Sequence, residues 1–405
     1  MLDPMSLVGK ALRVLREQGP REMLRRMRSR LIGEDGRDVL LARPEDVEAS
    51  DWRRPHPAVV SPSDRGQGPW KVAWIMSPPG INSGGHQTAL RMVKALEDAG
   101  HVCRIYLYSN ERPISVSESR RVMAASRSFE RVAAELLPWP GRLPEDVDAV
   151  FSTGWETAYP SFRSEAMARR FYFVQDFEPW FSPAGSESTL AESTYRFGFH
   201  GITAGRWLAT RLHDEYGMST DAFDFGADPG HYAYDPTAAH DEIMFYARPA
   251  TQRRGFELGL LALDIVARER PGTVINLVGT RIHRKLPFPY RSLHGLGADQ
   301  LGEVFNRCAA GLVLSFSNMS LMPLELLSAG AIPVVNDAPN NRLVVDNPHI
   351  RYAPPLPRAL ADELLAVLDD PARAEHAAAA ASSARMAGWD VARAQFLAAF
   401  ERAMR

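Results

Sequence analysis

The amino-acid sequence predicts an α/β protein that contains two doubly wound parallel-sheet domains in succession. Its 405 residues are enough for two domains at roughly 100–200 residues each. From residue 70 onward, short apolar runs typical of buried strands alternate with stretches of helical periodicity, which is the pattern of parallel sheets with crossover helices. A net charge of −2 with 24% charged residues excludes a generally basic nucleic-acid coat and an acidic disordered chain, so no nucleic-acid partner is expected.

The first 69 residues precede this pattern and form a separate, basic segment. Residues 1–32 contain eight Lys or Arg and three Asp or Glu, a local charge of +5, and their apolar residues recur at helical spacing around Gly19-Pro20. They predict two short basic amphipathic helices, which suit contact with a membrane surface or packing on the protein's own body. Residues 33–69, rich in Pro, Asp, Arg and Ser, predict a linker.

Residues 70–225 are expected to form the first α/β domain. A strand at 71–77, a Gly-rich loop, a helix at 86–99 and a strand at 101–108 make one βαβ unit. Three further apolar runs predict strands with helical stretches between them: 149–151, 170–174 and 198–203.

Residues 226–388 are expected to form the second α/β domain, followed by a last helix at 389–405. Its strands are predicted at 242–246, 273–278, 311–315 and 332–336. Its helices are predicted at 255–268, 300–308 and 321–328, and the chain from 356 to 404 has helical periodicity throughout. Cys103 and Cys308 both lie in apolar runs and suit buried thiols in a reducing cytoplasm.

The Gly-rich loop Gly80–Gly85 is the first candidate ligand site. Because it follows a strand and opens a helix, the backbone N–H groups at Gly84 and Gly85 could bind an anionic or hydroxyl-rich ligand. It matches neither the G-x-G-x-x-G dinucleotide motif nor the G-K-[ST] ending of a P-loop. A structural tight turn is an equally good explanation.

Cationic and acidic residues mark candidate positions in the second domain. Arg248 ends a strand, and Arg253-Arg254 stand just before a helix, where guanidinium groups and the helix dipole suit a phosphate; a solvated Arg cluster is the alternative. Glu325, near the start of a later helix, could accept two sugar hydroxyls or could merely stabilise the helix terminus.

Two acidic motifs lie in the first domain. Asp146-Val147-Asp148 has the D-x-D form that can hold a divalent ion, but its place in a turn favours a solvated pair, so no metal is expected. Gln175–Phe181 (QDFEPWF) follows a strand end, and its Asp176, Glu178 and aromatic residues suggest a wall for a polyol, or else a structural loop.

Together these motifs resemble the glycosyltransferases of the GT-B fold, of the family 4 type, over about residues 70–400. The likeness rests on a Gly-rich loop in the first half, then Arg…Arg-Gly, Val-Gly after a strand, and S-x₉-E-x₄-G-x-x-P-V. The stretch 173–197 resembles more particularly rhamnosyltransferases that build bacterial surface polysaccharides from dTDP-L-rhamnose. The resemblance implies two Rossmann-like domains that face a cleft, with the donor in the second and the acceptor in the first.

The resemblance also implies roles for individual residues. Arg248 and Arg254 match the cationic grip on the donor diphosphate, and Glu325 matches the second of two family glutamates, which binds the ribose. The first glutamate is replaced by Ser317, so its sugar contact is expected to be lost, or to be remade by Ser317, Asn318 or the backbone amides of 318–321. The segment 224–228 and Trp389-Asp390 match the crossings between the domains. The complete set of expected donor-binding residues is Gly84, Gly85, Gln175, Arg248, Arg253, Arg254, Gly279, Ser317, Asn318, Met319, Ser320, Leu321 and Glu325.

The implied function is transfer of a sugar from a nucleotide diphosphate sugar to a glycan or lipid-linked glycan, with retention and without a required cofactor. Arg248 and Arg254 would stabilise the leaving diphosphate, and Asp176 or Glu178 would orient the acceptor hydroxyl. The expected location is the cytoplasm, at the inner face of the membrane if residues 1–32 bind lipid. The alternatives are a UDP- or GDP-sugar donor, a non-catalytic module that binds sugar nucleotides or polysaccharide, and an epimerase or phosphorylase on the same fold. A phosphorylase would require a pyridoxal lysine, for which the second half offers no suitable context.

Overall fold

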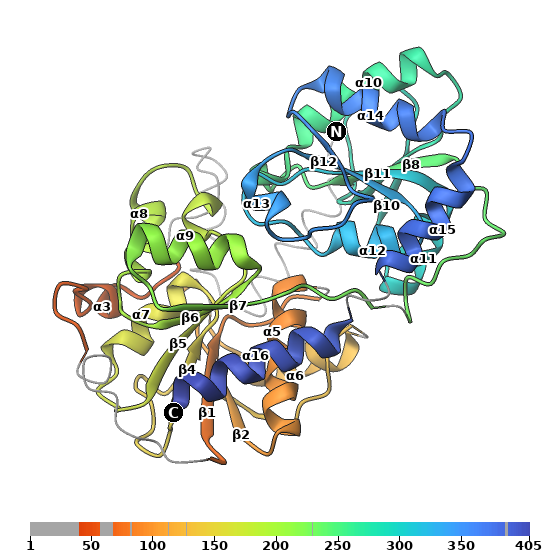
Figure 1. Ribbon diagram of the computed structural model, residues 1–405. Coiled ribbons are helices and arrows are strands. Elements are labelled where there is room, and N and C mark those ends of the chain that lie inside the picture. Colours follow the sequence, from red (N-terminus) through yellow and green to blue (C-terminus); the bar gives the residue numbers. More distant parts are fainter. Residues whose placement is uncertain are drawn as a thin grey trace, which may run out of the picture.

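The computed structural model describes residues 40–56, 68–81, 83–111, 113–126, 128–228, 230–384 and 388–405. The predicted basic helices at 1–32 lie outside these ranges. The described chain forms two α/β units that lie next to each other and are joined near the end of β7 (Figure 1). Each unit has one sheet of parallel strands covered by helices, so the predicted fold class is confirmed.

The first unit contains a seven-stranded sheet in the order β3-β2-β1-β4-β5-β6-β7. All of its strands are parallel, and the strand order reverses between β1 and β4, where ligands bind in open α/β sheets. The strands are β1 Lys71–Met76, β2 Val102–Leu107, β3 Glu135–Pro138, β4 Ala149–Ser152, β5 Arg169–Val174, β6 His200–Ala204 and β7 Thr220–Phe223. The helices are α3 Pro44–Glu48, α5 Gly84–Asp98, α6 Val116–Ala125, α7 Trp155–Arg163, η1 Glu178–Phe181, α8 Ser186–Thr194 and α9 Arg206–Tyr216.

The second unit contains a six-stranded parallel sheet in the order β10-β9-β8-β11-β12-β13, with the reversal between β8 and β11. The strands are β8 Glu242–Ala247, β9 Ile275–Gly279, β10 Arg291–His294, β11 Cys308–Val313, β12 Ile332–Asn336 and β13 Arg351–Ala353. The helices are η2 Gln252–Arg254, α10 Phe256–Glu269, α11 Ala298–Arg307, α12 Met322–Ser328, α13 Pro339–Arg342, α14 Pro357–Leu368 and α15 Arg373–Ala384, and the last helix of the chain, α16 Trp389–Met404, follows them.

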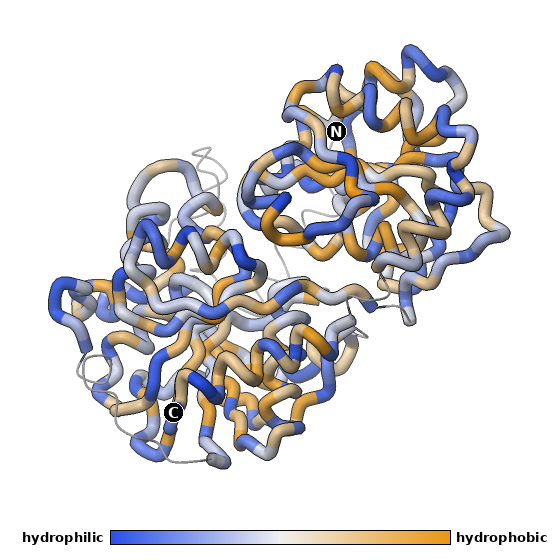
Figure 2. Tube along the Cα trace, in the orientation of Figure 1, coloured by the Kyte–Doolittle hydropathy of each residue, from blue (hydrophilic) through white to orange (hydrophobic). Residues whose placement is uncertain are grey.

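The central strands are buried on both faces, as covered parallel strands require. Every residue of β4, β6 and β11 is buried, and hydrophobic stretches run through the interior of both units in Figure 2. Cys103 and Cys308 are both buried and free. The strand expected at 311–315 lies three residues earlier, because α11 ends at Arg307 and Cys308 already has extended backbone angles.

Helix α16 follows the second unit in the chain but packs on the first (Figure 1). Its Phe396 and Phe400 are fully buried there, with the Phe396 ring 5.5 Å from Phe151 and the Phe400 ring 5.3 Å from Phe171. The two segments that cross between the units meet where Ala227 pairs with Gly388. A Cβ atom on Gly226 would lie 2.6 Å from the backbone nitrogen of Trp389, so only glycine permits this close approach.

Candidate functional site

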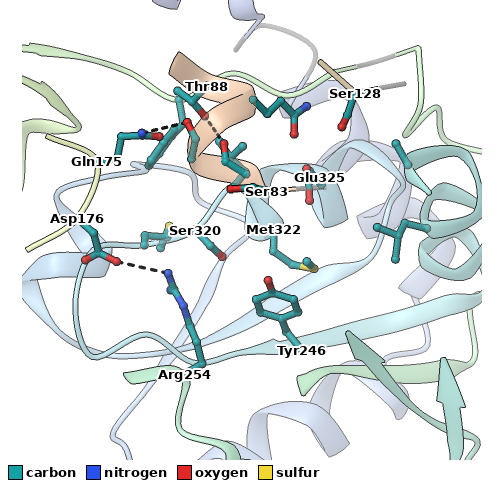
Figure 3. A pocket seen from close by; sticks show the side chains of 18 of the residues that line it. Ser83, Thr88, Ser128, Gln175, Asp176, Tyr246, Arg254, Ser320, Met322 and Glu325 are labelled. Atoms are coloured by element: carbon teal, nitrogen blue, oxygen red, sulfur yellow. Dashed lines mark hydrogen bonds and ion pairs between the residues drawn. The ribbon is translucent and has the colours of Figure 1, made fainter. Parts of the chain in front are cut away.

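A cavity of about 520 Å³ lies between the two units (Figure 3). It is lined by the segments that follow β1, β4 and β5 in the first unit and by those that follow β8, β10 and β11 in the second. The carboxyl ends of both parallel sheets therefore face the same space. This is the edge at which open α/β sheets bind ligands, and here two such edges are opposed.

The loop after β1 brings the start of α5 to the cavity. Ser83, Gly84 and Gly85 line it. His86 lies behind them: its Nε2 is 2.9 Å from the Ser77 carbonyl oxygen, to which it donates, so Nδ1 is left to accept from the Ser83 hydroxyl at 2.8 Å. Burial lowers the pKa of His86, which keeps the ring neutral and preserves this pairing. The His86 side chain thus holds the loop through hydrogen bonds to Ser77 and to Ser83.

Two consecutive arginines line the opposite wall. Arg253 and Arg254 end the short helix η2, and Gly255 turns the chain into α10 with φ +59°, a left-handed conformation that favours glycine. Arg254 donates through Nη1 to the Ser315 hydroxyl (2.7 Å) and the Asn318 carbonyl oxygen (3.2 Å). Arg253 stacks on Phe181 of the first unit, with its Cζ 3.8 Å from the ring centroid. Both guanidinium groups are therefore fixed in position.

Glu325 lies in the first turn of α12 and lines the cavity. Burial raises the pKa of its carboxyl to about 7, although a hydrogen bond from Tyr232 and the charge of Arg91 act in the opposite direction. Burial also raises the pKa of Tyr232, which stays protonated as the hydrogen-bond donor. This carboxyl is consequently in equilibrium between two protonation states near neutral pH.

The loop between β11 and α12 is held by buried amide side chains. The Ser315 carbonyl oxygen accepts from the amide groups of Asn336 (2.9 Å), Asn340 (3.1 Å) and Asn341 (3.2 Å). Asn318 extends across the cleft instead, since its Nδ2 donates to the main-chain oxygens of Gln175 (3.0 Å) and Ala204 (2.8 Å). The hydroxyl oxygens of Ser317 and Ser320 are buried and have no hydrogen-bond partner among the residues that the structure describes, and Ser320 lines the cavity.

The two carboxylates of the QDFEPWF segment have different environments. Asp176 Oδ2 lies 3.3 Å from Arg253 Nε and 3.7 Å from Arg254 Nη2, and so reaches the second unit. Glu178 is bound within the first unit: its Oε2 accepts from the Trp155 backbone N–H (2.5 Å) and the Tyr172 hydroxyl (3.0 Å). Burial raises the pKa of Glu178 well above its usual range, which favours the neutral acid over a base.

The aromatic residues of the same segment divide between core and surface. Phe177 is buried, whereas Trp180 and Phe181 are 43% and 42% exposed. Arg211 stacks on Phe177 at 4.0 Å and on Trp180 at 4.5 Å, which fixes the exposed ring. Phe181 lines the cavity, so an exposed aromatic surface continues outward from it on the first unit.

The structure brings most of the expected site residues to this one cavity. Those that line it are Gly84, Gly85, Gln175, Asp176, Glu178, Arg253, Arg254, Met319, Ser320, Leu321 and Glu325. Arg248, Gly279, Ser317 and Asn318 do not. Arg248 is exposed, with its Cζ 5.6 Å from the ring of the lining residue Tyr246, while Ser317 and Asn318 are fully buried.

Sequence reasoning missed two tyrosines that line the cavity, Tyr232 and Tyr246. Tyr246 is the only residue of β8 that is not fully buried, and its place one residue before the strand end was the available indication. Tyr232 lies between the last strand of the first sheet and the first strand of the second, where no periodicity points to a site.

The D-x-D motif lies at the opposite edge of the first sheet. Asp146 pairs with Lys71 (3.2 Å) and Arg104 (3.1 Å), and Asp148 accepts from the Lys71 backbone N–H (2.8 Å), just before β1 and β4 begin. Within the described ranges, no group of three His, Cys, Asp or Glu side chains is placed to hold a metal ion. The same residues include no helix that is both long and apolar enough to cross a membrane.

Comparisons with known proteins bear on both sequence and fold. Residues 241–365 match the family model of the WsaF C-terminal domain. The O-antigen biosynthesis protein RfbC of Myxococcus xanthus is 33% identical over 264 residues, which are 62% of this chain, and the chain spans about a fifth (21%) of that relative's length.

Solved structures identify the two-unit arrangement. HepE of Anabaena in complex with UDP-glucose superposes with a TM-score of 0.64 over 82% of this chain and 100% of its own, at 13% identity. The sucrose-phosphate synthase of Thermosynechococcus elongatus gives 0.61 over 82% and 98%, also at 13% identity. At such low identity these matches establish the fold alone. The chain therefore has the GT-B fold of glycosyltransferases, and its second unit matches the C-terminal domain of WsaF.

Proposed function

We propose that the protein is a glycosyltransferase of polysaccharide or O-antigen biosynthesis that transfers a sugar from a nucleotide diphosphate sugar to a glycan acceptor. The observation that carries this proposal is the cavity between two opposed sheet edges, with two fixed arginines on one wall and carboxyl and aromatic groups on the other. The likeness to an O-antigen biosynthesis protein supports the acceptor class.

In this proposal the second unit binds the donor. Arg253 and Arg254 meet the diphosphate and stabilise the negative charge that develops on it as the glycosidic bond lengthens. Glu325, at the start of α12, accepts the ribose hydroxyls, and the loop Met319–Leu321 contacts the sugar. Arg248 does not line the cavity but lies over the ring of Tyr246, which does, and adds positive charge near the donor site.

The first unit binds the acceptor, in the same proposal. Asp176 orients the acceptor hydroxyl, and the exposed rings of Trp180 and Phe181 give sugar rings an apolar surface next to the cavity. Glu178, held neutral and bound to the Tyr172 hydroxyl, supports this wall and does not act as the base.

The finer assignments are L-rhamnose from dTDP-L-rhamnose as donor, retention at the anomeric carbon, and no required metal. Ser317 at the place of a family glutamate removes one hydrogen-bond acceptor, which suits a deoxysugar with fewer hydroxyls. With Glu178 neutral, the carboxylates among the lining residues are Asp176 and Glu325, which the proposal assigns to the acceptor hydroxyl and the ribose. Attack on the donor's own face, assisted by the leaving group, needs no further protein base.

The experiment is a thermal-shift screen of the full chain with dTDP, UDP and GDP and their sugars, followed by assay of released nucleoside diphosphate with acceptor glycans. A donor-class nucleotide raises the melting temperature by mass action. Arg254→Ala should remove both this shift and the transfer. Binding without release of diphosphate in the presence of any acceptor would identify a non-catalytic module, and unchanged transfer by Arg254→Ala would refute the site.

A further inference from the structure

A carboxylate of the first unit lies where the arginines of the second would meet an anionic ligand. Asp176 Oδ2 is 3.3 Å from Arg253 Nε and 3.7 Å from Arg254 Nη2. Its other oxygen, Oδ1, accepts from the backbone N–H groups of Asn318 (2.7 Å) and Phe177 (2.8 Å). Asp176 is buried and lines the cavity, and Figure 3 shows its carboxylate joined to the Arg254 guanidinium group by a dashed line.

The charges of this cluster are unequal. Two guanidinium groups share one carboxylate, and both approach the same oxygen atom. A diphosphate offers two negative charges and several oxygens, so it matches a pair of arginines better than a single carboxylate does. A diphosphate bound beside Asp176 would bring like charges together, so the diphosphate and the Asp176 carboxylate must compete for the two arginines.

A second set of contacts between the two units does not involve the Asp176 carboxylate. Asn318 Nδ2 donates to the main-chain oxygens of Gln175 and Ala204. These hydrogen bonds would persist if the Asp176 carboxylate left the arginines. The Asn318 side chain thus connects the cleft walls through hydrogen bonds that do not depend on the contact of Asp176 Oδ2 with the arginines.

We propose that Asp176 substitutes for the donor diphosphate in the donor-free protein, and that the donor displaces it from Arg253 and Arg254. This inference rests on the proposed function and deepens it. Oδ2 of Asp176 is then free to accept a hydrogen bond from the acceptor hydroxyl, while Oδ1 keeps its backbone N–H donors. Donor binding therefore prepares the acceptor side, and the donor binds before the acceptor does.

The test measures the dissociation constants of the nucleoside diphosphates dTDP, UDP and GDP by calorimetry on the full chain. Asp176→Asn keeps the size of the side chain and removes the competing charge, so the affinity should rise by about tenfold, which corresponds to about 1.4 kcal/mol. The same variant should transfer sugar more slowly, because it lacks the carboxylate that orients the acceptor. Tighter binding combined with slower transfer is a result that a purely structural role would not give.

Three control variants separate the effect of the lost charge on diphosphate affinity from the effect of changing the side chain. Asp176→Glu keeps the charge and should bind no more tightly than the natural protein, whereas Asp176→Ser should also bind more tightly, which covers the case in which the Asn variant does not fold. Asp146→Asn removes a carboxylate that pairs with Lys71 and Arg104 at the far sheet edge and should leave the affinity unchanged.

The outcomes distinguish this inference from the proposed function. Equal or weaker diphosphate binding by folded Asp176→Asn and Asp176→Ser overturns the exchange and leaves the transferase proposal standing. If dTDP, UDP and GDP all fail to bind the natural protein and every variant, both proposals are refuted together.

Discussion

Glu325 gives the sharpest prediction, because its carboxyl changes charge in the range where the protein would work. Burial raises its pKa to about 7, so roughly 90% of molecules carry the carboxylate at pH 8 and roughly 10% at pH 6. If only the ionised form accepts both ribose hydroxyls, the apparent dissociation constant is the intrinsic one divided by the ionised fraction. Donor binding should then weaken about tenfold as the pH falls from 8 to 6.

The assay is calorimetric titration with a complete nucleotide sugar rather than a free diphosphate. A free diphosphate has a terminal phosphate that titrates near pH 6, whereas the diphosphate of a nucleotide sugar has no such group. Glu325→Gln is the matched control, since it stays neutral and should bind weakly with the same affinity at both pH values. The neighbouring charged or titratable groups Arg91, Asp228, His231 and Tyr232 remain in this variant, so any slope that they cause would persist.

The Glu325 carboxyl should also make the stability of the protein depend on pH. The folded protein holds the Glu325 proton more tightly than the unfolded chain does, so stability should fall as the pH rises from about 4.5 to about 7. Glu325→Gln should remove this loss and raise the melting temperature at pH 8. A natural protein with equal donor affinity at pH 6 and 8, or a Gln variant with the same pH slope, would refute the assignment of the carboxylate.

Three further substitutions test other parts of the structure. Gly255→Ala forces a left-handed position at a cost of about 1–2 kcal/mol and places Cβ 2.9 Å from a neighbouring ring carbon, so melting temperature and nucleoside-diphosphate affinity should both fall. Phe396→Ala should reduce the free energy of unfolding by about 3–5 kcal/mol in chemical denaturation, whereas Val391→Ala, exposed on the same helix, should change it by about 0.5 kcal/mol or less. Trp180→Ala should raise the acceptor KM and leave donor affinity unchanged, whereas the equally exposed Trp52→Ala should alter neither; unchanged acceptor KM would remove the aromatic surface from the acceptor site.

The interior strands could be predicted from the sequence, and the edge strands could not. The apolar run at 71–77 corresponds to β1, and that at 332–336 to β12. The four strands without a corresponding prediction, β3, β7, β10 and β13, are the outer strands of the two sheets. Each has three or four residues and contains polar or partly exposed positions, so it is too short to show a period.

The site was predictable to the extent that it depends on local chain order. Residues after strand ends and at helix starts, such as Gly84, Arg254 and Glu325, could be found because parallel topology places those points at one sheet edge. The contact of Asp176 with the arginines depends on how two separate units face each other, which no local pattern encodes. The neutral state of Glu178 likewise depends on burial by residues distant in sequence.

Helix α16 also determines the order in which the parts of this protein can mature. The ribosome makes the first sheet early, but Phe396 and Phe400, which fill part of its core, are made only after the whole second unit. During synthesis the second unit can complete its own core while the first still exposes an apolar groove, a state that is open to misfolding and aggregation. The unit that begins first is thus the last to be finished.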